Sequence, residues 1–148
     1  MNTIPLTFDI MSTDPNAGLG VRVRLNNSVL YENSHLTSAH HFSHDVSDED
    51  AEHELEIEMF GKLPEHTKIS DTGEIISDVL LEINNIAMDG LEINKVAQDL
   101  IEYHHDFNGG QTAVVDKFYG SMGCNGCLRL KFTTPIRSEE HTSELQSH

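Results

Sequence analysis

HELEIEMFGK at residues 53–62 and SDVLLEINNIAMDGLEINKV at residues 77–96 alternate apolar and polar side chains with a period of two. In the first stretch, Leu55, Ile57 and Met59 share one face, and the glutamates between them share the other. Successive side chains of a strand point to opposite faces of a sheet. The pattern therefore predicts antiparallel strands that are buried on one side and solvated on the other, which makes the chain all-β.

The same alternation predicts further strands at 4–10, 20–25, 28–32, 95–107, 114–119 and 128–133. Residues 95–107 fit a helix about as well as a strand, and the all-β context favours the strand. Asn26-Asn27 and Asp89-Gly90 are predicted two-residue hairpin turns, since both pairs accept positive φ angles. Residues 33–52 lose the pattern, so only a short strand or helical turn near 37–42 is expected there. About eight or nine strands predict a single antiparallel β-sandwich of jelly-roll type.

The last twelve residues, 137–148, differ in character from all that precedes them. RSEEHTSELQSH is polar and patternless, and it resembles the conceptual translation of a short-read sequencing adapter. A genuine disordered terminus is the alternative. We therefore predict a β-sandwich domain over residues 1–136, truncated at its C-terminus, and an artefactual or disordered tail over 137–148.

Composition excludes several classes of function. The formal net charge is -16 with histidine neutral, and so acidic a surface repels nucleic-acid phosphates. No apolar run approaches the about 18 residues of a membrane span, and residues 1–10 lack the features of a signal peptide. We therefore expect no nucleic-acid partner, no membrane partner and synthesis in the cytoplasm.

The segment GKLPEHTKISDTGEIISD at residues 61–78 is the best candidate for a binding site. It carries four carboxylates, those of Glu65, Asp71, Glu74 and Asp78. Calcium takes about six to eight oxygen ligands, which acidic side chains on a flexible loop can supply. We predict these four residues as metal ligands with Ca²⁺ as the candidate ion, although their spacing is not that of an EF-hand. A solvated acidic turn around Asp71 is the alternative.

Cysteines and histidines offer weaker candidates. Cys124-Asn125-Gly126-Cys127 has the spacing of half a zinc or redox site, but the strand pattern predicts a tight turn at Asn125-Gly126 that sets Cys124 opposite Cys127. A metal site and a disulfide are the alternatives. His104-His105-Asp106 cannot form a triad alone, because adjacent strand residues point to opposite faces and no nucleophile elbow is present. We therefore predict no catalytic residue. A small hydrolase that uses His104 and a carboxylate is a third and weaker hypothesis for the function.

Two stretches carry a family resemblance. ISDVLLEINNIAMDGLEI at 76–93 resembles the closing strands of calcium-dependent xylan-binding carbohydrate-binding modules, and VRVRLNNSVLYE at 21–32 is similar to their early hairpin. The resemblance implies a module-like sandwich in which Asp71 and Asp78 are the counterparts of calcium ligands. The Asn-Asp and Asp-Arg-Asn signature of that family is absent. EHTKISDTGEI at 65–75 and DKFYGSMGCNG at 116–126 also resemble uncharacterised proteins of marine tailed phages.

These resemblances lead to two functional hypotheses. The first is a non-enzymatic structural or adhesion component of a phage particle, made in the host cytoplasm and then incorporated into the virion. Its partners would be other virion proteins or a surface glycan. The alternative is a Ca²⁺-dependent glycan-binding module of a larger carbohydrate-active protein. With no Trp and three Tyr, the chain has few residues for stacking on sugars, so a glycan would be bound through its hydroxyls.

Overall fold

The computed structural model describes residues 3–49, 51–63, 66–88, 91–92, 100–105, 114–118 and 120–134. Its strands are β1 (Thr3–Ser12), β2 (Gly20–Leu25), β3 (Ser28–Asn33), β4 (His40–Ser47), β5 (Ala51–Phe60), β6 (Lys68–Ile69), β7 (Ile75–Ser77), β8 (Leu81–Met88), β9 (Leu91–Glu92), β10 (Glu102–His105), β11 (Val114–Lys117), β12 (Ser121–Met122) and β13 (Gly126–Thr134).

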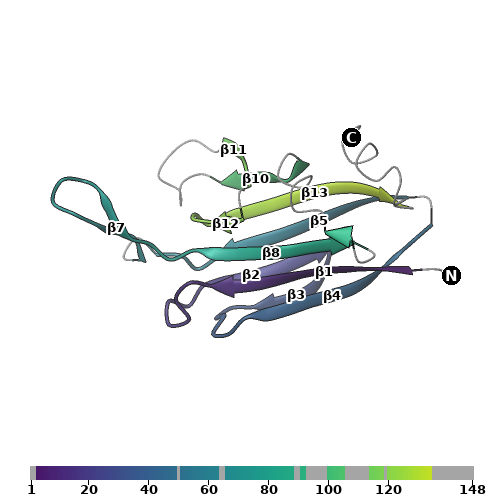
Figure 1. Ribbon diagram of the computed structural model, residues 1–148, viewed down its shortest axis with the longest axis horizontal. Helices are drawn as coiled ribbons and strands as arrows, with labels where there is room; N and C mark the ends of the chain where they lie inside the picture. The colour runs from purple at the N-terminus through teal and green to yellow at the C-terminus, as the bar shows by residue number, and fades with distance from the viewer. Residues whose placement is uncertain are drawn as a thin grey trace.

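Two antiparallel sheets form a sandwich (Figure 1). The five-stranded sheet has the order β12-β8-β1-β4, with β9 paired to β8, and the six-stranded sheet has the order β11-β10-β13-β5-β2-β3. In Figure 1, β8, β1 and β4 lie in front, and β5, β2 and β3 lie behind them. The predicted all-β sandwich is therefore confirmed. No helix in the described part of the chain is long and apolar enough to cross a membrane.

A single apolar core fills the space between the sheets. Alternate side chains of β1, β5 and β13 point into it, and the apolar ones among them are at most 5% exposed. Phe8 from β1 stacks on Phe42 from β4, with 4.6 Å between the ring centroids. Leu55, Ile57 and Met59 are all buried, which confirms the predicted inward face of residues 53–62. The opposite face is less solvated than predicted, because Glu56 is only 7% exposed and Glu54 and Glu58 are half-buried.

The first predicted hairpin is also confirmed. Asn26 and Asn27 have φ angles of 52° and 70°, and they join Leu25 to its pairing partner Ser28. Positive φ at both central residues is what a type I′ turn needs, and asparagine accepts it at low cost. Met88 likewise pairs with Leu91, whereas the predicted turn residues Asp89-Gly90 lie outside the described residues.

The expectation for residues 33–52 was wrong in extent. Strand β4 is eight residues long and pairs with β1 from His40 to Ser47. Only Phe42 and Val46 are buried in it, because the inward position between them is occupied by the half-buried His44. Histidine counts as polar in a hydropathy pattern, so the alternation of β4 is hidden in the sequence. Of the strand predicted over 95–107, the structure shows β10.

The predicted turn between the two cysteines is also wrong. Neither Asn125 nor Gly126 has a positive φ angle, and β12 and β13 belong to different sheets. The segment between these strands thus carries the chain from one sheet to the other. Gly126 is needed for a close approach, since a Cβ atom there would lie 2.3 Å from the His104 carbonyl oxygen. Cys127 pairs in register with His104 and Glu58 rather than with Cys124.

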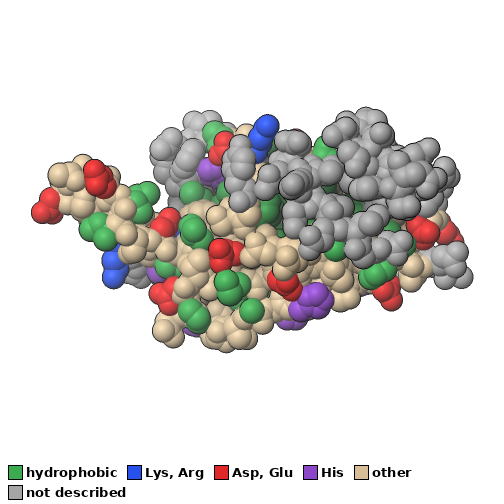
Figure 2. Space-filling model, in the orientation of Figure 1, with side chains coloured by type: hydrophobic (Ala, Val, Ile, Leu, Met, Phe, Trp, Pro, Cys, Tyr) green, Lys and Arg blue, Asp and Glu red, His purple; other side chains and the backbone are tan. Residues whose placement is uncertain are grey.

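Strands β6 and β7 form a small separate hairpin that projects from the sandwich (Figure 1). Its side chains Ile69, Ile75 and Ile76 are 59%, 65% and 68% exposed. Hydrophobic and acidic side chains both lie on this projection in Figure 2. The hairpin contributes little to the core, so its position depends on the contacts at its base.

Candidate functional site

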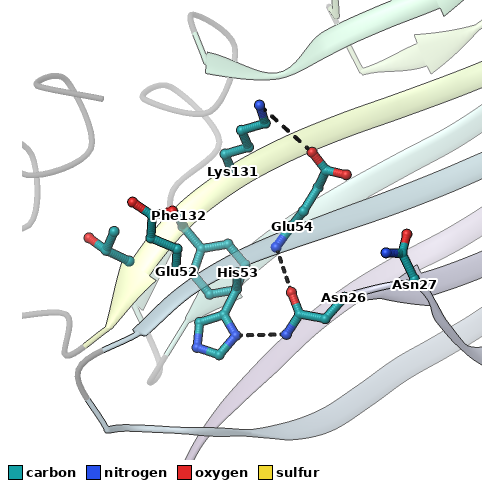
Figure 3. A pocket seen from close by; sticks show the side chains of 8 residues that line it. Asn26, Asn27, Glu52, His53, Glu54, Lys131 and Phe132 are labelled. Carbon is teal, nitrogen blue, oxygen red and sulfur yellow. Dashed lines mark hydrogen bonds and ion pairs between the residues drawn. The ribbon is translucent and has the colours of Figure 1, made fainter.

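An open hollow with a volume of about 820 Å³ lies at one end of the six-stranded sheet (Figure 3). The β2–β3 turn, the start of β5 and the end of β13 meet there. Most of its described lining residues are polar, and they are Asn26, Asn27, Glu52, His53, Glu54, Lys131, Phe132 and Thr133. Amide, carboxylate and ammonium groups are thus brought together in one concave region.

His53 forms the buried floor of the hollow. Its ring stacks on Phe132, with 5.1 Å between centroids, and its Nε2 lies 3.2 Å from Thr134 Oγ1. Its Nδ1 lies 3.0 Å from the Asn26 amide nitrogen. The Asn26 Oδ1 accepts a hydrogen bond of 2.9 Å from the Glu54 backbone N–H, which fixes the orientation of the amide. Because an amide nitrogen can only donate, Nδ1 of His53 accepts, and the imidazole is neutral with its proton on Nε2.

Burial of the His53 ring agrees with this neutral state. The side chain is largely removed from water, and this desolvation lowers the pKa of His53 below its ordinary value. The chain of contacts from Thr134 through His53 to Asn26 therefore holds the floor of the hollow rigid. In contrast, the Lys131 ammonium at the rim is 78% exposed and lies 4.0 Å from the Glu54 carboxylate. An ion pair of that kind contributes little to stability.

The outer face of the six-stranded sheet continues from the hollow as a ladder of opposite charges. One row of cross-strand partners runs Lys117, Glu102, Arg129, Glu56 and Arg24, with the sign of the charge alternating at each strand. The Glu56 carboxylate lies 3.6 Å from both Arg24 and Arg129. Such opposite-charge neighbours stabilise a sheet modestly.

The outer face of the six-stranded sheet gathers most of the positive charge of an acidic protein. Its cationic residues are Arg22, Arg24, Lys117, Arg129 and Lys131, out of nine Lys and Arg in the chain. In the coloured part of the opposite face, shown in Figure 2, Lys and Arg side chains appear only at the margins. Arg22 and Arg24 share the Glu58 carboxylate at 3.0 and 2.9 Å. The face thus offers closely spaced hydrogen-bonding groups of both signs.

Three of the four predicted calcium ligands lie on or beside the β6–β7 hairpin. Asp71 and Glu74 are exposed at the turn of the β6–β7 hairpin, and Asp78 lies at its base. Glu65 lies outside the described residues. Within the described ranges, no group of three or more His, Cys, Asp or Glu could hold a metal ion. Calcium at these residues therefore stays a prediction.

Asp78 is already engaged by other groups. Its Oδ1 accepts hydrogen bonds from Lys62 Nζ at 2.6 Å, from Thr67 Oγ1 at 2.7 Å and from the Val79 backbone N–H at 2.9 Å. Burial alone would raise the pKa of Asp78, but the hydrogen bonds from Lys62 and Thr67 hold it below its ordinary value. The carboxylate is therefore ionised and paired within the protein.

The histidines of β10 lie on opposite faces, as predicted for adjacent strand residues. His104 Nε2 lies 3.0 Å from Glu102 on the outer face, whereas the buried His105 lies 2.6 Å from the Asp116 carboxylate. Buried Tyr103 accepts a hydrogen bond from the Cys124 N–H at 2.8 Å, and burial raises the pKa of its hydroxyl. The Tyr103 contact joins β10 to the segment that crosses between the sheets, and the His105 contact joins β10 to β11.

The sequence interpretation missed the hollow and the ladder. The sequence placed Asn26 in a turn and His53 at the start of a strand, with no further role for either. One signal was present: Arg22 and Arg24 alternate with the same period as the glutamates of 54–58. Pairing β2 with β5 would have placed these opposite charges side by side.

The comparisons with known proteins concern the fold. No family model and no curated protein matches the chain. The chain is similar to a solved structure described as "vCBM60 in complex with galactobiose", with 12% identity, a TM-score of 0.47, and coverage of 87% of this chain and 97% of that one. It is also similar to the SeMet form of vCBM60, solved in work that describes two families of calcium-dependent carbohydrate binding modules.

That second likeness has 10% identity and a TM-score of 0.50, and it covers 86% of this chain and 89% of the other. At so low an identity the likeness concerns backbone architecture alone. The chain therefore has a β-sandwich fold similar to that of vCBM60.

Proposed function

We propose that this chain is a non-catalytic glycan-binding module and that its ligand lies in the polar hollow beside the β2–β3 turn. The observation that carries the proposal is the set of amide, carboxylate and ammonium groups around that concave region. Sugar hydroxyls both donate and accept hydrogen bonds, so they match such a mixed set. The fold likeness to vCBM60 supports the proposal.

The rigidity of the floor favours binding. Asn26 is held by Glu54 and His53 at 2.9 and 3.0 Å, so its position does not have to be ordered when a ligand arrives. A pre-ordered site loses less conformational entropy on binding. The described lining contains no Tyr or Trp, so recognition rests on hydrogen bonds rather than on stacking.

Charge at the rim favours a neutral sugar. Glu52 and Glu54 both line the hollow, and Lys131 is the cationic member of the described lining. An acidic sugar would be repelled by the two carboxylates and by the strongly negative protein as a whole. We therefore assign neutral oligosaccharides as the ligand class.

The proposal leaves two expectations from the sequence in place as predictions. Calcium dependence would need the residues Glu65, Asp71, Glu74 and Asp78, and a titration with and without EDTA tests it. A role in a phage particle rests on the sequence resemblance alone, and none of the comparisons with known proteins supports it.

Calorimetric titration tests the proposal with galactobiose and xylo-oligosaccharides as neutral probes and an oligogalacturonate as an acidic probe. Glu52→Gln and Asn27→Gly should each weaken binding of a neutral probe by about tenfold, the value expected for one lost hydrogen bond to a strong partner. Glycine suits position 27 because its φ is 70°. Asp45→Asn, an exposed change on β4 of the other sheet, is the matched control and should leave binding unchanged.

Two results would overturn the assignment. Binding that is equally strong in wild type and both hollow variants would place the ligand elsewhere on the sandwich. The absence of binding to every neutral probe, or hydrolysis of a bound probe during the titration, would refute a non-catalytic module for neutral glycans.

A further inference from the structure

Lys62 is the most deeply buried cation among the described residues. Its side chain is only 1% exposed. The ammonium lies 2.6 Å from Asp78 Oδ1 and 2.5 Å from the Gly123 carbonyl oxygen. A charged ammonium is removed from water at low cost only when such oxygen partners replace its hydration shell.

The backbone of Lys62 is held as firmly as its side chain. Its N–H donates to Asn125 Oδ1 at 2.9 Å, and its C=O accepts from the Asn125 amide nitrogen at 3.0 Å. One amide side chain thus satisfies both backbone groups, as a partner strand would. Lys62 follows β5, Asp78 follows β7, and Gly123 and Asn125 lie between β12 and β13.

These contacts make one joint of three segments that are distant in the sequence. The joint lies where the projecting β6–β7 hairpin leaves the sandwich and where the chain crosses from one sheet to the other. The Lys62 ammonium contacts the Asp78 carboxylate and the Gly123 carbonyl oxygen, and the Thr67 hydroxyl donates to the same carboxylate. Oxygen donors of this kind are also those that Ca²⁺ takes.

We propose that the Lys62 ammonium acts as the internal cation of this joint, and that the base of the β6–β7 hairpin is ordered without a divalent metal ion. Asp78 is thereby removed from the set of calcium ligands predicted from the sequence. The Oδ1 atom of Asp78 already receives three donors, so a metal ion there would have to break these contacts and lie beside a buried positive charge. The proposal is independent of glycan binding.

Thermal melts in EDTA and in millimolar Ca²⁺ test the proposal. The wild type should melt at the same temperature in both buffers. Lys62→Met keeps the unbranched stem of the side chain but removes the ammonium and leaves Asp78 without its cation, so the melting temperature should fall by about 10 °C. Lys68→Met changes an exposed lysine on β6 and is the matched control, with no expected change.

A double-variant cycle and hydrogen exchange add readouts that a general packing role would not move. Asp78→Asn should also lower the melting temperature, and Lys62→Met/Asp78→Asn should lower it by clearly less than the sum of the two single losses. In EDTA, exchange of the Val79 amide should be slow in the wild type and faster in Asp78→Asn, because that N–H donates to the carboxylate.

Two outcomes would overturn the proposal. One is a wild type that melts higher in Ca²⁺ than in EDTA, with the difference lost in Asp78→Asn, since Asp78 would then bind the metal. The other is strictly additive losses in the double variant. If Lys62→Met does not fold, the proposal is still tested by the wild-type melting temperatures in the two buffers and by the exchange rate of the Val79 amide. Glycan affinity, measured separately, distinguishes failure here from failure of the proposed function.

Discussion

Replacing Leu81 by alanine tests the central packing of the sandwich. Leu81 is 0% exposed, and β8 places it between Ser12 of β1 and Met122 of β12 in the register of the sheet. Neighbours on both sides restrict how far the structure can relax around the missing atoms. We therefore expect Leu81→Ala to cost about 3 kcal/mol of unfolding free energy, within the range of about 2–5 for buried leucines.

The adjacent residue provides the control. Glu82 follows Leu81 in β8, points to the opposite face and is only partly buried, so Glu82→Ala should cost less than about 0.5 kcal/mol. For a domain of this size, the cost of Leu81→Ala corresponds to a fall in melting temperature of about 10 °C. Urea titrations of the two variants and the wild type measure both values. Equal costs would refute the assignment of Leu81 to the core and of Glu82 to the surface.

Two further predictions concern titrating groups. Because burial lowers the pKa of His53 in the folded state, the contribution of the neutral ring is complete above the ordinary value of 6.5 and is lost as the pH falls below it. His53→Gln should therefore show a weaker loss of stability between about pH 7 and pH 5 than the wild type in urea titrations, and parallel curves would contradict this. Burial, with a further contribution from the Glu56 carboxylate, raises the pKa of the Cys127 thiol. Iodoacetamide at neutral pH should thus label Cys127 more slowly than it labels the cysteine of a short unfolded peptide. Mass spectrometry of the labelled peptides measures both rates, and equal rates would show an accessible thiolate.

Local features of the sequence were enough to predict most of the longer strands and one turn. The alternation over 53–62 gave the buried face of β5 because a side-chain period of two is a property of the strand itself. Asn26-Asn27 gave the β2–β3 turn because few residues other than asparagine and glycine accept positive φ. Strand β4 was underestimated because the half-buried His44 breaks the apolar pattern at an inward position.

The choice of partners depended on the tertiary structure. The turn predicted at Asn125-Gly126 failed because β12 pairs with β8 and β13 pairs with β10 and β5, a choice made by packing between sheets rather than by the residues in the turn. The four carboxylates over 65–78 stay a predicted calcium site, because a sequence counts charges without showing the distances between them. Only the fold brings Lys62 to Asp78 and buries its ammonium, because that contact joins three segments whose approach depends on the closure of the whole sandwich.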